Sequence, residues 1–182
     1  MIACRRVRRR ADKERGQAIL EFLGVMVLLL TLAFAAVEFG YLIWENQVIV
    51  NLSREGSNLA ARNTNLITAV NAVISDGAML NLSTNGKVII TAIQNKGTPA
   101  TPHFVITNQS SAGGLGATSV YGVYNGSGTQ VVNNLTQYSV TIPQPGSSIF
   151  VTEVYCSYTA ITPLGAFMSY TVPTTLHDVA YF

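Results

Sequence analysis

The chain has 182 residues, of which 48% are hydrophobic and only 11% are charged. This composition excludes a highly charged disordered chain, and the length fits one domain with an appendage. The formal net charge of +2 is unevenly spread, because residues 1–16 hold seven of the 11 Lys and Arg residues but two of the nine acidic residues. The remaining chain is therefore acidic overall, and we expect no nucleic-acid partner, since neutralising phosphates needs a basic surface.

An apolar segment follows the basic head. Residues 22–37 contain no charged residue, and the stretch continues to Trp44 with Glu38 as its one carboxylate. A membrane-spanning helix needs about 20 mostly apolar residues, so this segment is long enough. The arginine-rich head predicts an orientation with the head in the cytoplasm and everything after Trp44 on the other side.

Three kinds of segment share this pattern. One is a secretory signal peptide cut after Ala35, the second is a plain signal anchor, and the third is a leader cut on the cytoplasmic side, which leaves the apolar helix on the mature protein. Glu21 favours the third, because a carboxylate at the start of an apolar core is costly unless it is paired.

The residues around Glu21 resemble the start of a type IV pilin. Gly16 precedes Gln17, Glu21 is the fifth residue counted from Gln17, and the aromatic Phe22 is the sixth. The resemblance implies cleavage between Gly16 and Gln17, after which Glu21 pairs with the new amino terminus of a neighbouring subunit.

The predicted helix extends beyond the membrane. No Pro interrupts residues 17–62, and apolar residues recur at helical spacing as far as Leu59. We expect a helix over 17–62, transmembrane to about residue 44, and a role for Glu38 at an interface because it lies near the apolar core. The charges further along (Glu45, Glu55 and Arg62) are expected on a solvated helix surface.

Three stretches of this region resemble the TadE-like pseudopilins of the tight-adherence (Flp-type) pilus system. They are Arg15–Phe22, Val37–Gly40 and Ser53–Arg62, with a weaker likeness at 149–158 and 161–164. The resemblance implies a minor pilin that a prepilin peptidase processes and that contacts other pilin subunits, the inner-membrane assembly platform and membrane lipid. It implies a single-pass inner-membrane protein with its C-terminal domain extracytoplasmic, or an extracellular subunit once it is in a filament.

Residues 63–182 are predicted to form a β-rich domain. A short helix is expected at 66–74, and a hairpin of 79–82 with 88–93 is expected around the Asn85-Gly86 turn signal. Further strands are expected at 103–107, 120–124, 138–142, 149–158 and 169–172, with 94–119 as a long exposed loop. The predicted fold is thus α+β and pilin-like: a long N-terminal helix whose outer half packs on a small antiparallel sheet.

Catalytic and metal-binding motifs are not recognised. The two histidines, His103 and His177, have no carboxylate or Cys cluster at ligand spacing, so we expect neither a metal nor another cofactor. His177 and Asp178 are interpreted as a surface polar pair, and Cys156 as a small buried hydrophobic residue. A structural protein rather than an enzyme is expected; the alternative is a secreted or membrane-anchored adhesin or binding module.

Overall fold

The computed structural model describes residues 2–62, 64–98, 100–128, 130–132, 144–163 and 173–182, with the backbone alone at 2–15. The chain forms two compact units. The first comprises Met1–Tyr41 and Ala160–Val172, and the second comprises Leu42–Thr159 and Pro173–Phe182. Each is described by itself below.

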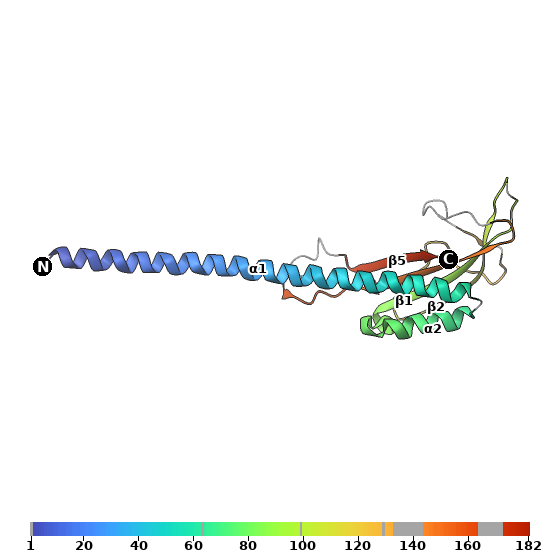
Figure 1. Ribbon diagram of the computed structural model, residues 1–182, viewed down its shortest axis with the longest axis horizontal. Helices are drawn as coiled ribbons and strands as arrows, with labels where there is room; N and C mark the ends of the chain where they lie inside the picture. The colour runs from blue at the N-terminus through green and yellow to red at the C-terminus, as the bar shows by residue number, and fades with distance from the viewer. Residues whose placement is uncertain (1, 63, 99, 129, 133–143, 164–172) are drawn as a thin grey trace. The chain divides into compact units, whose positions relative to one another are not determined.

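Helix α1 (Ile2–Ala61) confirms the long N-terminal helix (Figure 1). It includes the basic head as well as the predicted residues 17–62, because no Pro breaks the backbone hydrogen-bond ladder. In the first unit α1 contacts residues 160–163, and in the second unit its outer half packs on the sheet.

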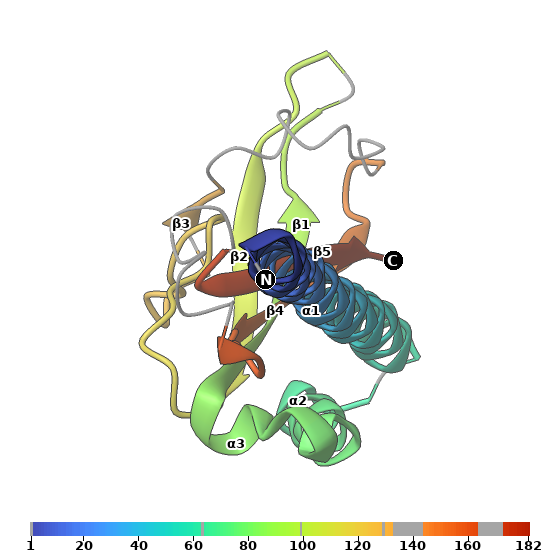
Figure 2. The same cartoon turned by 90° about the vertical axis from the view of Figure 1, so that its left-hand side faces the viewer.

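The second unit contains short helices and five strands. After α1 come α2 (Leu66–Asp76), the 3-10 turn η1 (Gly77–Leu80) and α3 (Leu82–Asn85), and then β1 (Gly86–Asn95), β2 (Phe104–Ala112), β3 (Gln130–Val131), β4 (Ser148–Ser157) and β5 (Thr175–Tyr181). The strands form one antiparallel sheet in the order β3-β2-β1-β4-β5. Helix α2 packs on β1 and β2, and α3 lies beside β1 (Figure 2). The α+β architecture is therefore confirmed.

The central strands are buried on both faces, because a different part of the chain covers each. Thr152 of β4 faces α1, since its methyl group lies beside Gly56. Successive residues of a strand point to opposite faces, so Val151 and Glu153 face the other way. There Val151 joins Ile93 and Tyr121 in a buried hydrophobic cluster.

Several predicted elements are confirmed within a few residues. The helix at 66–74 lies within α2 and the strand at 88–93 within β1. The strand at 149–158 coincides closely with β4, and the strand at 103–107 covers the first half of β2. The predicted strands at 138–142 and 169–172 lie outside the described residues. Strand β5 was not predicted.

The predicted hairpin of 79–82 with 88–93 is wrong. Residues 79–82 are divided between η1 and α3, and Asn81 between them has a φ of 51°. Asn tolerates this left-handed conformation, in which the backbone turns too sharply for a strand. The true partners of β1 are β2 and β4, which come later in the chain.

The exposed loop predicted over 94–119 is also wrong, because it contains β2. The polar residues of β2 find partners inside the domain: the amide of Gln109 donates to Thr91 Oγ1 at 2.9 Å and to the Gly122 carbonyl at 3.0 Å. The predicted strand at 120–124 does not form. Its Val120 and Tyr124 N–H groups donate instead to side chains, Glu153 Oε1 at 2.9 Å and Gln109 Oε1 at 3.1 Å.

Candidate functional site

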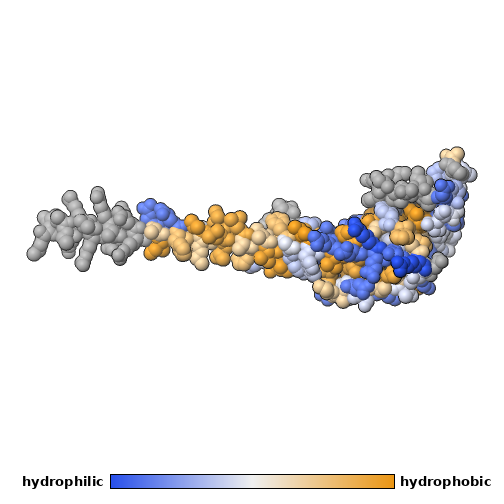
Figure 3. All heavy atoms as spheres, in the orientation of Figure 1, coloured by the Kyte–Doolittle hydropathy of each residue, from blue (hydrophilic) through white to orange (hydrophobic). Residues whose placement is uncertain are grey.

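The first part of α1 exposes almost all of its apolar side chains. Phe22, for example, is 68% exposed and Val37 is 54% exposed, and Figure 3 shows hydrophobic residues along this stretch of the helix. Among the described helices, one stretch, within Gly16–Ala61, is long and apolar enough to cross a membrane, and its most apolar part has no buried residue. Such a surface needs lipid or other apolar helices around it.

The predicted processing and pairing residues lie together at the start of this stretch. The Gln17 side-chain amide donates to Glu21 Oε1 at 3.0 Å, one helical turn further on. Among the described residues, no atom outside the local helix backbone lies within 4 Å of the place that a Cβ of Gly16 would occupy. Gly16, Gln17 and Glu21 are all exposed, so the Glu21 carboxylate lies on the surface of the helix.

Glu38 lies at the other end of the apolar stretch and has its partners in the same chain. Its side chain is 2% exposed. The N–H of Ile161 donates to Glu38 Oε1 at 3.3 Å, while the N–H and hydroxyl of Thr162 donate to Oε2 at 2.8 and 2.6 Å. Within this chain the Glu38 carboxylate holds residues 160–163 against α1. The predicted interface role of Glu38 in assembly stays a prediction.

A stripe of small and polar residues on α1 faces the sheet. The Ser53 hydroxyl donates to a carboxylate oxygen of Asp178, and Ser57 Oγ donates to the Ala180 carbonyl at 2.8 Å. Glu45 belongs to the buried side of the helix, which corrects the prediction that it is solvated, whereas Glu55 and Arg62 are exposed as predicted. Ser53 and Ser57 carry no charge and form no recognised motif, so the sequence analysis did not identify them as contacts with the sheet.

Gly56 sets how closely α1 approaches β4. A Cβ at this position would lie 2.7 Å from Thr152 Cγ2 and 3.1 Å from Val73 Cγ2. Distances this short are below van der Waals contact, so the close packing of helix on sheet requires glycine here.

Beyond the sheet's other face, Glu153 organises a polar cluster. Its side chain is fully buried, and Tyr155 donates its hydroxyl proton to Glu153 Oε1 at 2.9 Å. The ring of His177 stacks on Tyr155 at a centroid distance of 4.1 Å, with Nε2 4.0 Å from Glu153 Oε1. His177 and Asp178 therefore do not form the predicted surface pair, because adjacent strand residues point to opposite faces and Asp178 reaches Ser53 instead.

Acidification is expected to destabilise the domain through His177. Burial lowers the pKa of His177 from its ordinary 6.5, against the opposite effect of the Glu153 and Asp178 carboxylates. The unfolded chain then binds this proton more readily than the folded one, so stability is lost as the pH falls below about 6.5. Thermal unfolding followed by circular dichroism at about pH 8 and about pH 5 measures the loss.

The His177→Phe variant, which keeps a ring on Tyr155 but cannot titrate, is expected to reduce this pH dependence. His103→Phe, which replaces a histidine outside the Glu153 cluster, is the matched control. Equal pH dependence in the wild type and in His177→Phe would contradict the assignment to His177.

The remaining candidates offer no reactive group. Cys156 is buried, as predicted, and burial, together with the negative charge of Glu45, raises the pKa of its thiol to about 11. Within the described residues, no three His, Cys, Asp or Glu side chains lie close enough together to hold a metal ion.

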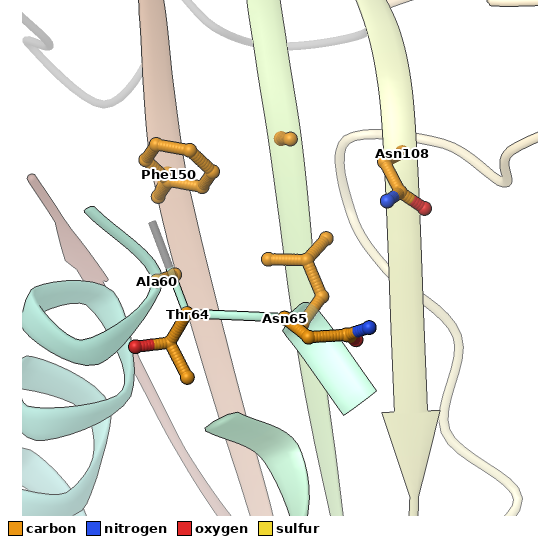
Figure 4. Close-up of a pocket in the computed structure, with 7 residues that line it drawn as sticks. Ala60, Thr64, Asn65, Asn108 and Phe150 are labelled. Atoms are coloured by element: carbon orange, nitrogen blue, oxygen red, sulfur yellow. The ribbon is translucent and has the colours of Figure 1, made fainter. Parts of the chain in front are cut away.

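A pocket of about 270 Å³ lies where the end of α1 and the start of α2 cross the sheet (Figure 4). Asn65, which lines it together with Asn108 and Phe150, already uses its side-chain oxygen to cap α2 through the Ile67 N–H at 2.9 Å. We assign no ligand to this pocket.

The comparison with protein families agrees with these observations. Residues 16–58 match the family model described as TadE-like protein. The chain is TadE-like over this segment. The TadE-like segment begins at the Gly16–Gln17 bond, includes Glu21, Phe22 and Glu38, and reaches the stripe that faces the sheet. Neither the comparison with curated proteins nor that with solved structures gave a match. The weaker likeness at 149–158 and 161–164 lies outside the matched residues and stays a prediction.

Proposed function

We propose that this TadE-like chain is a minor pilin, or pseudopilin, of a tight-adherence (Flp/Tad) type IV pilus. The observation that carries the proposal is the placement of Glu21 on an exposed apolar stretch of helix, one turn after the exposed Gln17. An ordinary membrane anchor gains nothing from a carboxylate in this position. In a pilin, the carboxylate can neutralise the amino terminus that cleavage creates on a neighbouring subunit.

The proposed organisation follows from this role. Residues 1–16 are a leader that a prepilin peptidase removes, residues 17–62 are a helix that is transmembrane to about residue 44, and residues 63–182 form an extracytoplasmic domain. The basic residues of the leader keep it in the cytoplasm. Before assembly the helix lies in the inner membrane, and during assembly its apolar surface exchanges lipid for the helices of other pilins on the assembly platform. The role is structural, not enzymatic.

The mature protein is expected to begin at Gln17, because cleavage after Gly16 makes Glu21 the fifth residue, as in the pilin pattern. The test is amino-terminal sequencing of the protein purified from cells that also make the prepilin peptidase. Replacing Gly16 by leucine is expected to block processing, which is seen in a denaturing gel as a band heavier by the 16 leader residues.

Gly24→Leu is the matched control, because a Cβ at Gly24, like one at Gly16, meets no atom within 4 Å. This variant is expected to be processed normally. A mature protein that begins at Ala36 would instead indicate an ordinary signal peptide and a secreted module, and would overturn the proposal.

A further inference from the structure

Residues 160–163, here called the strap, present their backbone to α1 and an apolar side chain to the outside. Ile161 is 52% exposed, although the N–H groups of Ile161 and Thr162 both donate to the buried carboxylate of Glu38. In a turn that faces water, the backbone N–H groups bond to solvent. Here the N–H groups bond to protein, and an apolar side chain is exposed instead.

This arrangement meets the requirement for irregular backbone at membrane depth. Lipid offers no acceptors, so a non-helical segment can lie there only where protein satisfies its polar groups. Glu38 supplies acceptors for two strap N–H groups and the Thr162 hydroxyl, and these bonds in turn offset the cost of a carboxylate near the apolar region.

The position of Glu38 along the helix places the strap at the edge of the lipid core. Glu38 is 21 residues after Gln17, which at about 1.5 Å per residue corresponds to about 32 Å, close to the ~30 Å thickness of the hydrocarbon core. The sequence around the strap is compatible with this depth, because no Asp, Glu, Lys or Arg occurs between Glu153 and Asp178.

We propose that the strap is a second membrane contact, resting in the interfacial region of the outer leaflet beside α1, with Glu38 as the residue that holds it there. The strap adjoins the apolar surface of α1 that is proposed to face lipid, since Val37 and Phe39 on either side of Glu38 are exposed apolar residues. The proposal rests on the proposed membrane insertion of α1. It gives the protein two contacts with the bilayer, the helix and the strap.

The test places a fluorescent probe at residue 161 of the full chain in phosphatidylcholine vesicles. A nitrobenzoxadiazole label is attached to Ile161→Cys in a Cys4→Ser background, in which Cys156 stays unlabelled because it is buried and its pKa is raised to about 11. Quenching by nitroxide-bearing lipids then reports contact with the bilayer, at an expected depth of about 5–10 Å. Two reference probes complete the set: Val37→Cys in the proposed span, and Asp76→Cys at the exposed end of α2.

Lipid quenching at residues 161 and 37 but not at residue 76 is the expected result. Quenching at residue 37, with residue 161 behaving like residue 76, would overturn the strap proposal and leave the membrane span intact. No quenching at residue 37 would contradict membrane insertion itself, and with it the proposed function.

The part played by Glu38 is tested with Glu38→Ala. Loss of the three acceptor contacts is expected to abolish lipid quenching at residue 161, while quenching at residue 37 is retained. Unchanged quenching at residue 161 would overturn the assignment of Glu38 as the residue that positions the strap. Thr162→Val, which removes one of the three hydrogen bonds, is expected to give a partial loss.

Discussion

Replacing Glu21 by alanine is expected to leave the chain in the membrane and to abolish its incorporation into a filament. Removing the carboxylate lowers the cost of placing the helix in lipid, so insertion is not impaired. Incorporation is impaired, because the amino terminus of a neighbouring subunit then lies unpaired among apolar helices. Breaking a buried ion pair in this way costs about 3–5 kcal/mol, which corresponds to a loss of about 150- to 4,000-fold in the association constant.

The measurement compares the chain in sheared filaments with the chain in membranes for the wild type, Glu21→Ala and Glu55→Ala. Glu55 is the matched control, because it is an exposed glutamate of the same helix beyond the proposed span. It is expected to leave incorporation unchanged. Normal incorporation of Glu21→Ala would remove the role assigned to this carboxylate.

Replacing Gly56 by valine is expected to lower the free energy of unfolding by about 1–3 kcal/mol, the usual cost of overpacking a close contact. The added Cβ alone would lie 2.7 Å from Thr152 Cγ2 and 2.9 Å from Thr152 Oγ1. Thr152 cannot move aside, because it is fully buried on a central strand between β1 and β5. For a chain of this size, each kcal/mol lowers Tm by about 2–4 °C.

Thermal unfolding of the detergent-solubilised chain checks this expectation. The control is Gly40→Val, since a Cβ at Gly40 meets no atom within 4 Å, and in an open helix valine costs no more than glycine. The double variant Gly56→Ala, Thr152→Ala is expected to be more stable than the sum of its single changes predicts, because it removes both clashing atoms. Equal Tm values for Gly56→Val and Gly40→Val would show that the helix does not depend on this close approach.

Sequence reasoning succeeded where the signal is local. The exposed apolar stretch, α2, and strands β1 and β4 all follow from runs of apolar residues, their period and the absence of Pro. The roles assigned to Gly16, Gln17 and Glu21 rest on the pilin resemblance and stay predictions. Sequence reasoning failed for the second half of β2. Its Asn, Gln and Ser residues are typical of a loop, and its strand conformation depends on pairing with β1.

The contacts of Glu38 could not be found in this way. Its partners lie 123 and 124 residues away, and no local pattern links a carboxylate in a helix to two backbone N–H groups so distant. Glu153 also accepts a hydrogen bond from a distant backbone group, the Val120 N–H. This bond explains why residues 120–124 do not form the strand that their apolar residues predict. In both cases a buried acid decides where an irregular segment lies.

The distance along the chain between α1 and its last partners also has a consequence for biosynthesis. The Ser57 hydroxyl donates to the carbonyl of Ala180, which is synthesised 123 residues later. At ribosomal speeds of about 5–20 residues per second, this hydrogen bond can form only after a delay of roughly 6–25 seconds. Throughout that interval the nascent chain has a helix whose inner side lacks its C-terminal strand. A chain released early would keep that side of the helix uncovered.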